Sequence, residues 1–293
     1  MSTPLIDGLV FPEALRWHNG RLWFVDMFAG QVLSVSAAGE LASVGAFADR
    51  TSGIGFRPDP ESTPLVVLMD SHQVMVLHRS GPEQLVEIAV APGQYLNDMV
   101  VDRHGRAYVD CVGDGSAEGP DDTILLLQPG GSYAPASTTT LHGPNGMAIT
   151  PDGRILIVAE PMASRLTAFT IEPDGTLIDG RLFADTGDDR ADGICIDAEG
   201  AVWFGSGRRG RFVRVLEGGE VTNTIETGQR WAVSCVLGGE ERRTLFMATS
   251  EVPETLAHSV SGRLSLASIV SELKRARGFI ETTQVEVPSV GTP

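Results

Sequence analysis

The sequence predicts an all-β protein, a six-bladed β-propeller whose four-stranded blades form a single domain over residues 1–293. Two observations predict this fold. One hairpin pattern recurs along the chain: an alternating apolar strand, a turn that contains glycine, and a second apolar strand. Its copies begin at nearly constant intervals, at positions 13, 52, 97, 145, 192 and 233. A period of about 40 to 50 residues with several short strands is typical of a propeller, whereas a β-sandwich has no such repeat.

The clearest copies of the hairpin lie in the middle of the chain. They begin at Asn97, Asn145 and Asp192, and each reaches a turn that ends in glycine. The second apolar strand of each copy covers residues 107–109, 155–158 and 202–204. The other three copies are weaker, but their spacing matches. Six repeats therefore fill the chain and predict six blades.

The last blade needs strands from both ends of the chain. Apolar alternation marks strands near residues 232–238, 244–249 and 279–287, one strand short of four. Residues 5–10 have no hairpin of their own, so we expect them to supply the outermost strand and leave no open sheet edge. Residues 267–276 interrupt the blade with apolar side chains at helical spacing, which predicts one short helical insertion.

Composition argues against several classes of function. With 38 acidic and 22 basic residues, the chain has a formal charge of −16 and no basic tract for nucleic acid. No apolar run approaches the roughly 18 residues that a membrane span needs. The first residues show no secretion signal and the three widely spaced cysteines suit reduced thiols, so we expect a cytoplasmic protein. We expect a monomer or a small homo-oligomer.

The first position of each repeat is the most informative feature of the sequence. The innermost strands of a propeller line its central channel, so equivalent positions form a ring. The ring residues are Glu13, Ser52, Asn97, Asn145, Asp192 and Val233. Two carboxylates and two amides form a hard-oxygen set that suits one divalent cation, Ca²⁺ first and Mg²⁺, Mn²⁺ or Zn²⁺ otherwise. Alternatively, each polar residue only hydrogen-bonds its own backbone in a turn.

Four segments carry a resemblance to a known family. Residues 11–17, 95–98, 144–147 and 191–194 resemble, in this order, the signature segments of the senescence marker protein / gluconolactonase / luciferin-regenerating enzyme family. The resemblance covers nearly the whole chain at matching blade spacing. It implies a six-bladed propeller with one catalytic divalent metal in the channel, in a family of which many members hydrolyse lactones.

The same resemblance assigns roles to the ring residues. It implies that the metal ligands are Glu13, Asn97, Asn145 and Asp192. Asp192 is also the implied general base, which would take a proton from the water that attacks a metal-polarised lactone carbonyl. In a second version of the mechanism, the metal itself activates the water.

Four further residues are candidates for substrate binding. Tyr95 stands where sugar-lactone members of the family often have an arginine, which argues against a polyhydroxylated or acidic sugar lactone and favours a less polar ring. Connections between second and third strands should share a face with the metal, so we expect Glu118 at the pocket rim and the helical insertion as a lid. His142 and Trp231 precede two ring positions and are expected near the pocket.

The sequence therefore predicts a metal-dependent hydrolase of a small lactone or related cyclic ester. The alternatives are a binding scaffold around a structural metal, and a family member with esterase-like or non-hydrolytic chemistry. The expected partner is a small-molecule lactone, with no nucleic acid and no membrane. The chain has neither a Gly-x-Ser-x-Gly nor a His-Glu-x-x-His motif, which argues against serine-hydrolase and zinc-protease chemistry.

Overall fold

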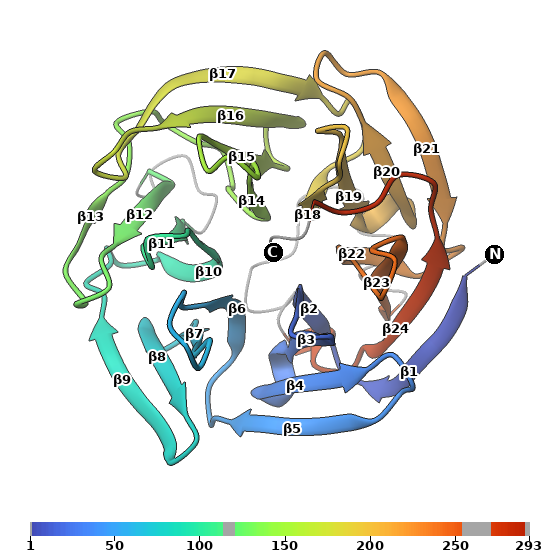
Figure 1. Cartoon of the computed structure of the whole chain (residues 1–293), viewed down its shortest axis with the longest axis horizontal. Helices are drawn as coiled ribbons and strands as arrows, with labels where there is room; N and C mark the ends of the chain where they lie inside the picture. Colours follow the sequence, from blue (N-terminus) through green and yellow to red (C-terminus); the bar gives the residue numbers. More distant parts are fainter. Residues whose placement is uncertain (1, 114–120, 254–270, 291–293) are drawn as a thin grey trace.

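The computed structural model describes residues 2–113, 121–253 and 271–290, and it confirms the six-bladed propeller. Six four-stranded antiparallel sheets stand around a central axis (Figure 1). Glu118, predicted at the pocket rim, and residues 267–270 of the predicted helical insertion lie outside the described residues.

Blades one to three each use four strands that are consecutive in the chain. Blade one contains β2 (Pro12–His18), β3 (Arg21–Asp26), β4 (Gln31–Ser36) and β5 (Leu41–Ala46). Blade two contains β6 (Thr51–Phe56), β7 (Pro64–Leu68), β8 (Gln73–His78) and β9 (Gly81–Glu87). Blade three contains β10 (Tyr95–Val101), β11 (Ala107–Val112), β12 (Thr123–Leu127) and β13 (Tyr133–Pro135).

Blades four and five continue the pattern, and blade six departs from it. Blade four contains β14 (Met147–Ile149), β15 (Ile155–Glu160), β16 (Arg165–Ile171) and β17 (Leu177–Asp185). Blade five contains β18 (Ala191–Ile196), β19 (Val202–Ser206), β20 (Arg211–Val215) and β21 (Val221–Glu226). Blade six contains β22 (Trp231–Gly238), β23 (Thr244–Glu251), β24 (Arg277–Gln284) and the N-terminal strand β1 (Thr3–Leu9).

The N-terminal strand closes the ring as predicted. β1 pairs antiparallel with β24, and Thr3 lies opposite Thr282. In Figure 1 the blue β1 lies beside the red β24 at the outside of the last blade. The two ends of the chain therefore share one sheet, and β24 pairs with a strand at each of its edges.

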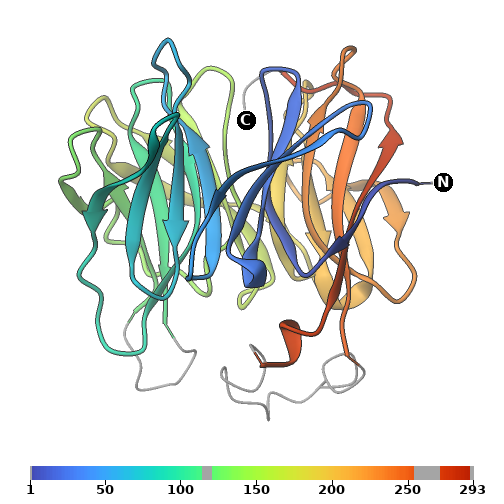
Figure 2. The same cartoon turned by 90° about the horizontal axis from the view of Figure 1, so that it is seen from below.

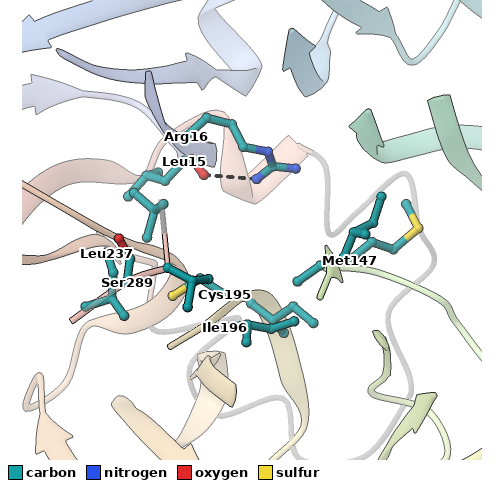
Figure 3. A pocket seen from close by; sticks show the side chains of 12 residues that line it. Leu15, Arg16, Met147, Cys195, Ile196, Leu237 and Ser289 are labelled. Atoms are coloured by element: carbon teal, nitrogen blue, oxygen red, sulfur yellow. Dashed lines mark hydrogen bonds between the residues drawn. The ribbon is translucent and has the colours of Figure 1, made fainter. Parts of the chain in front are cut away.

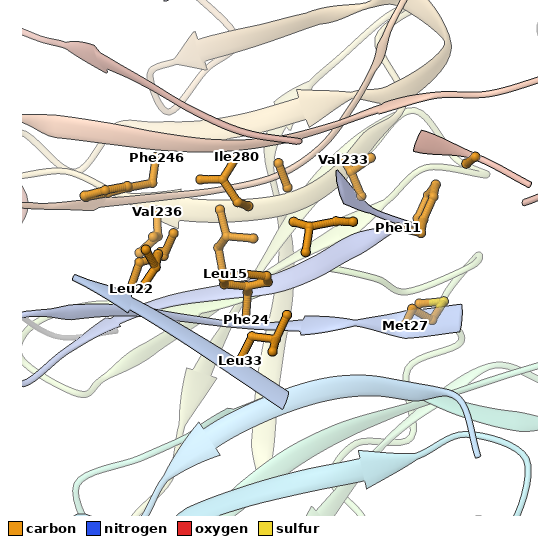
Figure 4. Close-up of a cluster of buried hydrophobic side chains, with 14 of the residues drawn as sticks. Phe11, Leu15, Leu22, Phe24, Met27, Leu33, Val233, Val236, Phe246 and Ile280 are labelled. Carbon is orange, nitrogen blue, oxygen red and sulfur yellow. The ribbon is translucent and has the colours of Figure 1, made fainter. Parts of the chain in front are cut away.

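Apolar side chains packed between neighbouring sheets hold the blades together. The cluster between blades one and six is drawn in Figure 4, where Leu15 and Phe24 of blade one belong to the same cluster as Val233 of blade six. These three side chains have no exposed surface. Burial of such groups removes apolar area from water, which is the main favourable term in folding. The three cysteines are also buried and form no disulfide.

The connections between second and third strands gather on the face where the innermost strands begin. The 3₁₀ turn η1 (Met27–Ala29) follows β3, whose last residue pairs with Pro12 at the start of β2. A second turn, η2 (Gly207–Arg209), follows β19. Residues 271–273 are helical, as the predicted insertion requires, and lie on the same face as η1 (Figure 2). Among the described residues, no helix has the length and hydrophobicity needed to cross a membrane.

Candidate active site

The four side chains predicted as metal ligands line one central cavity. It has a volume of ≈ 240 Å³ and lies where the innermost strands begin. Three of the four belong to strands: Glu13 to β2, Asn97 to β10 and Asp192 to β18. Asn145 lies two residues before β14. All four are partly buried. The structure thus brings the predicted set together, and metal binding by this set stays a prediction.

A repeated irregularity in the innermost strands accounts for the direction of these side chains. The pairing of β2 with β3 shifts register between Glu13 and Arg16. The strands β6, β10, β18 and β22 shift register at the equivalent place. A β-bulge bends the strand and redirects a side chain, and such bulges are common beside active sites.

Burial and nearby negative charge raise the pKa values of the two ring carboxylates. The pKa of Asp192 is raised to about 7, first by burial and then by the charge of Asp98, against a hydrogen bond with Asn145 that lowers it. Burial raises the pKa of Glu13 well above its usual value, and the charges of Asp192 and Asp98 raise it further. Both carboxylates can ionise together at low cost only if a cation balances them.

Two further carboxylates lie buried behind the ring. Burial raises the pKa of Asp110 well above its usual value, and the charge of Asp98 adds to this effect. Burial also raises the pKa of Asp98, although the nearby Arg16 guanidinium lowers it. Asn97 donates a hydrogen bond from Nδ2 to Oδ2 of Asp110 at 3.2 Å. That bond leaves the carbonyl oxygen Oδ1 of Asn97 available to a cation.

Arg16 spans the channel beneath the ring. Its Nη2 donates to Oδ1 of Asp98 at 3.1 Å and to the main-chain oxygen of Met99 at 2.5 Å, so it links blade one to blade three. Its Nη1 donates to the oxygen of Leu15 at 2.9 Å (Figure 3). Arg16 also lines a cavity of only ≈ 20 Å³, to which Ser289 of the C-terminal segment contributes. The channel is therefore narrow on this side.

The residues present fit a divalent cation. Oγ of Ser52 and Oδ1 of Asp110 are buried without a hydrogen-bond partner in the described structure, and both are hard oxygen atoms. The described residues hold no group of three or more His, Cys, Asp or Glu that could bind a metal ion. A cation here would therefore depend on the amide oxygens of Asn97 and Asn145 as well as on two carboxylates. An all-oxygen set of this kind suits Ca²⁺ or Mg²⁺.

The walls of the cavity above the ring are mainly apolar. The connections between second and third strands contribute Met27, Phe28, Met69, Pro161, Met162 and Leu273, and Val112 at the end of β11 adds to them. Met162 is 65% exposed. Apolar walls around a few convergent polar groups are typical of a small-molecule site. The connections between second and third strands thus lie on the same face as the predicted ligands, as expected from the sequence.

The candidate substrate residues have different outcomes. Tyr95 and Trp231 line the cavity. Trp231 is backed by Arg208, whose guanidinium carbon lies 6.0 Å from the ring centroid. His142 is exposed and is not among the lining residues; its main-chain N–H donates to Oε2 of Glu160 at 2.9 Å. Leu273, the last residue of the helical turn, does reach the cavity, while Glu118 lies outside the described residues.

Three charged residues near the cavity were missed by the sequence analysis. Asp98 directly follows the ring residue Asn97, and no role was assigned to it from the sequence. Asp110 lies on β11 and reaches the ring across the sheet, so no repeat position identifies it. Arg50 also lines the cavity. It stands two residues before the ring residue Ser52, just as Tyr95 stands two residues before the ring residue Asn97. Reading two residues back from every ring position would have found it.

Comparison with known proteins gives related sequences over the whole chain. A 6-deoxy-6-sulfogluconolactonase of Pseudomonas putida is 26% identical over 291 residues, which cover 96% of this chain and 90% of the relative. Two solved structures share the fold. A luciferin-regenerating enzyme superposes with a TM-score of 0.81 at 14% identity, covering 100% of this chain and 98% of the other. A calcium-binding regucalcin from Agrobacterium tumefaciens has a TM-score of 0.73 at 18% identity, covering 99% and 94%.

A family model gives the assignment directly. The model described as SMP-30/Gluconolactonase/LRE-like region matches residues 11–251, a range that begins just before the ring residue of blade one and ends with β23. The matched range contains all four side chains predicted as ligands. The chain therefore belongs to the SMP-30/gluconolactonase/LRE-like family.

Proposed function

We propose that this protein is a metal-dependent hydrolase of a small lactone or related cyclic ester. The observation that carries the proposal is the convergence of two carboxylates and two amides on one cavity with apolar walls. The Pseudomonas putida relative is named as a lactonase, and the regucalcin that shares the fold is described as calcium-binding. These names support a lactone substrate and a divalent cation, with Ca²⁺ as the first choice.

The ring residues would hold the cation and orient one another. Glu13, Asn97, Asn145 and Asp192 would be its ligands. When bound, the cation would supply Lewis-acid polarisation of a lactone carbonyl. Asp110 fixes the amide of Asn97 through the bond to Nδ2, and Asn145 hydrogen-bonds Asp192. Each ligand is thus oriented by a neighbour, as precise metal sites require.

Asp192 would move the proton of the reaction. Its carboxylate would accept a proton from water as the water oxygen attacks the carbonyl carbon. Burial, which raises the pKa of Asp192 in the metal-free protein, makes this carboxylate a stronger base. When the ring C–O bond breaks, the same carboxyl would return that proton to the departing alkoxide oxygen. The product is a hydroxy acid, which ionises and releases one proton to the solution.

A proton-release assay tests the proposal. Protein stripped with a chelator would receive Ca²⁺, Mg²⁺, Mn²⁺ or Zn²⁺ and then a panel of sugar and alkyl-substituted γ- and δ-lactones. We expect no turnover without metal and hydrolysis of at least one lactone after metal is restored. The apolar walls favour alkyl-substituted rings over polyhydroxylated ones.

Two other functions use the same cavity and predict different results. A scaffold with a structural ion would bind metal and gain thermal stability, yet hydrolyse no lactone. Esterase-like or non-hydrolytic chemistry would leave the lactones intact while acyclic esters or other substrates turn over. Metal binding without lactone hydrolysis would therefore reject our proposal in favour of one of these.

A further inference from the structure

A second ring of residues lies above the ligand ring. Its members stand two positions before each ring residue: Phe11, Arg50, Tyr95, Gly143, Arg190 and Trp231. Five of the six line the central cavity, whereas Arg190 is exposed and is not among the lining residues. Side chains two residues apart in an extended chain point to the same side, so both rings face the cavity.

This upper ring lies where the body of a substrate would lie. Two residues of extended chain span about 7 Å, so the upper ring is about that far from the ligand oxygens along the axis. That distance is comparable to a lactone ring with one short substituent. A lactone whose carbonyl meets the ligand ring would therefore present its substituent to the upper ring.

Arg50 is the one cationic residue among the cavity-lining residues that the structure describes. Its Nε donates to both carboxylate oxygens of Asp70 at 3.0 Å, and its Nη2 also bonds Oδ1 of Asp70. This pairing lowers the pKa of Asp70. Asp49 in turn accepts from the main-chain nitrogens of Asp70 and Ser71, at 3.0 and 2.8 Å, and so fixes the turn that carries Asp70.

The pairing with Asp70 leaves one edge of the guanidinium unused. Asp70 takes the edge formed by Nε and Nη2, and no hydrogen bond of the described residues uses Nη1. A guanidinium has five N–H donors in a rigid fork, and its second edge can bind another carboxylate in a bidentate manner. The side chain of Arg50 is only 18% exposed, so this edge is held rather than free to swing in solvent.

We propose that Arg50 is a specificity-determining residue, which selects lactones that carry an acidic substituent, such as a carboxylate, on an otherwise apolar ring. This inference rests on the proposed function and deepens it. The apolar walls would contact the ring, the ligand ring would face the carbonyl, and the free edge of Arg50 would bind the acidic group. An anion in this cavity needs such a partner, because the walls around it are mainly apolar and would otherwise leave its charge without a hydrogen-bond partner.

The alternative is that Arg50 only ties two connections together. Through Asp70 it joins the start of blade two to the turn after β7, and its main-chain oxygen accepts from Met69 N at 2.9 Å. A purely structural tie would affect stability and all substrates alike. A specificity residue would affect acidic substrates selectively, so a pair of matched substrates separates the two.

The test compares two γ-lactones that differ in one group, one with a carboxymethyl and the other with a carboxamidomethyl substituent. Calcium-loaded protein is assayed for kcat/KM, and equilibrium binding of each compound is measured by ligand-observed NMR.

In Arg50→Gln we expect the acid-to-amide ratio of kcat/KM to fall about 10- to 100-fold, the range for loss of one charge-assisted hydrogen-bonded contact. Most of the loss should lie in KM, since the contact is also made in the ground state. Arg50→Lys should recover part of the ratio, because it keeps the charge but loses the fork.

Arg181→Gln is the matched control. Arg181 pairs with Glu217 at 3.2 Å on the outermost strand of blade four, away from the cavity, and its loss should not change the ratio. If kcat/KM falls by the same factor for the acid and the amide in Arg50→Gln, the inference is overturned and Arg50 only links two connections of the fold. If the unmodified protein hydrolyses neither compound, equilibrium binding of the two compounds decides on Arg50. The proposed function itself fails only if no lactone of the panel is hydrolysed. Acid binding that weakens in Arg50→Gln would support selection by Arg50, and unchanged binding would reject it.

Discussion

Asp192 combines two properties that a proton-transfer residue needs. It faces the cavity beside Glu13 and Asn145, and burial brings its pKa close to neutrality. A carboxyl with a pKa near the working pH is an effective base when ionised and an effective acid once protonated. At an exposed site the same side chain would titrate near pH 4 and would be a weaker base.

Asp192→Asn should therefore remove activity without unfolding the protein. The amide keeps the shape and a metal-binding oxygen but cannot accept the proton, so kcat/KM should fall about 10²- to 10⁴-fold. The melting temperature of the metal-free variant should be unchanged or higher, because one buried charge is gone. Asp7→Asn, on the exposed part of β1, is the control and should behave as the unmodified protein. Activity within tenfold of the unmodified protein would assign the base elsewhere.

The ring residues could be predicted from the sequence because the repeat is regular. Counting from one hairpin to the next identifies equivalent positions, and a propeller brings equivalent positions together. Arg50 follows from the same counting, two positions back. Asp110 could not be predicted in this way, because its approach to Asn97 depends on how β10 and β11 pair around a bulge. His142, chosen for its closeness in sequence to Asn145, is exposed outside the cavity, since a loop residue next to a ring position has no fixed direction.

At the scale of the element, the residue directly after the ring position lets neighbouring innermost strands approach closely. A Cβ on Gly53 would lie 2.7 Å from the nitrogen of Met99, in the next blade. A Cβ on Gly193 would lie 2.4 Å from Oγ of Ser234, again in the next blade. Blade one has Ala14 at this position, with a φ of 50°, in the left-handed region that favours glycine. Close contact of the inner strands thus explains glycine at several of these positions.

Gly146→Ala should be strongly destabilising for this reason. Its Cβ would lie 2.4 Å from the main-chain oxygen of Asp192 and 2.7 Å from the nitrogen of Ile194, so backbone must move. Forced overpacking of this kind costs about 1 to 3 kcal/mol. We expect a melting temperature about 2 to 10 °C lower, and a loss of activity because Asp192 shifts.

Gly130→Ala is the matched control for that substitution. Gly130 has no atom within 4 Å of its would-be Cβ and no positive φ. Its replacement should leave both the melting temperature and the activity close to those of the unmodified protein. Equal melting temperatures for the two variants would contradict the close approach of blades four and five.

The strands were predictable as hairpins, and the helical insertion only in part. Alternation and glycine turns mark each strand pair locally, so their positions need no knowledge of the rest of the fold. The apolar stripe over 267–276 did indicate a helix, and residues 271–273 are helical with Leu273 buried against the cavity. The predicted role of the insertion as a lid rests mainly on residues outside the described part of the chain, and it stays a prediction.

For the whole molecule, closure of the ring by β1 should matter more than any single blade contact. Deletion of residues 2–9 would remove β1 and expose the edge of β24 along its whole length. We expect a melting temperature at least about 5 °C lower, together with concentration-dependent association through the open edge. Thermal unfolding and light scattering measure these two effects. Asp7→Ala keeps the strand pairing and should show neither; a monomeric truncated protein of unchanged stability would contradict closure by β1.

The buried carboxylates of the channel make the stability of the fold depend on pH and on bound metal. In metal-free protein the pKa values of Glu13, Asp98, Asp110 and Asp192 are all raised. Between the unfolded values near 4 and the folded values, the folded state binds more protons than the unfolded state. The free energy of unfolding therefore falls as the pH rises through this interval, which for Asp192 ends near pH 7. His18 acts in the opposite direction, because burial lowers its pKa and unfolding then takes up a proton.

The stabilisation by calcium should consequently be larger at pH 8 than at pH 5.5. At pH 8 the carboxylates are ionised and a bound cation relieves their repulsion, whereas at pH 5.5 it must first displace protons. The increase in melting temperature on adding calcium is the correct measure, because the His18 contribution is common to both samples and cancels. One pKa unit corresponds to about 1.4 kcal/mol, so the two increments should differ by about 5 °C or more. Asp192→Asn should reduce the difference. Equal increments at the two pH values would show that calcium does not bind among these carboxylates.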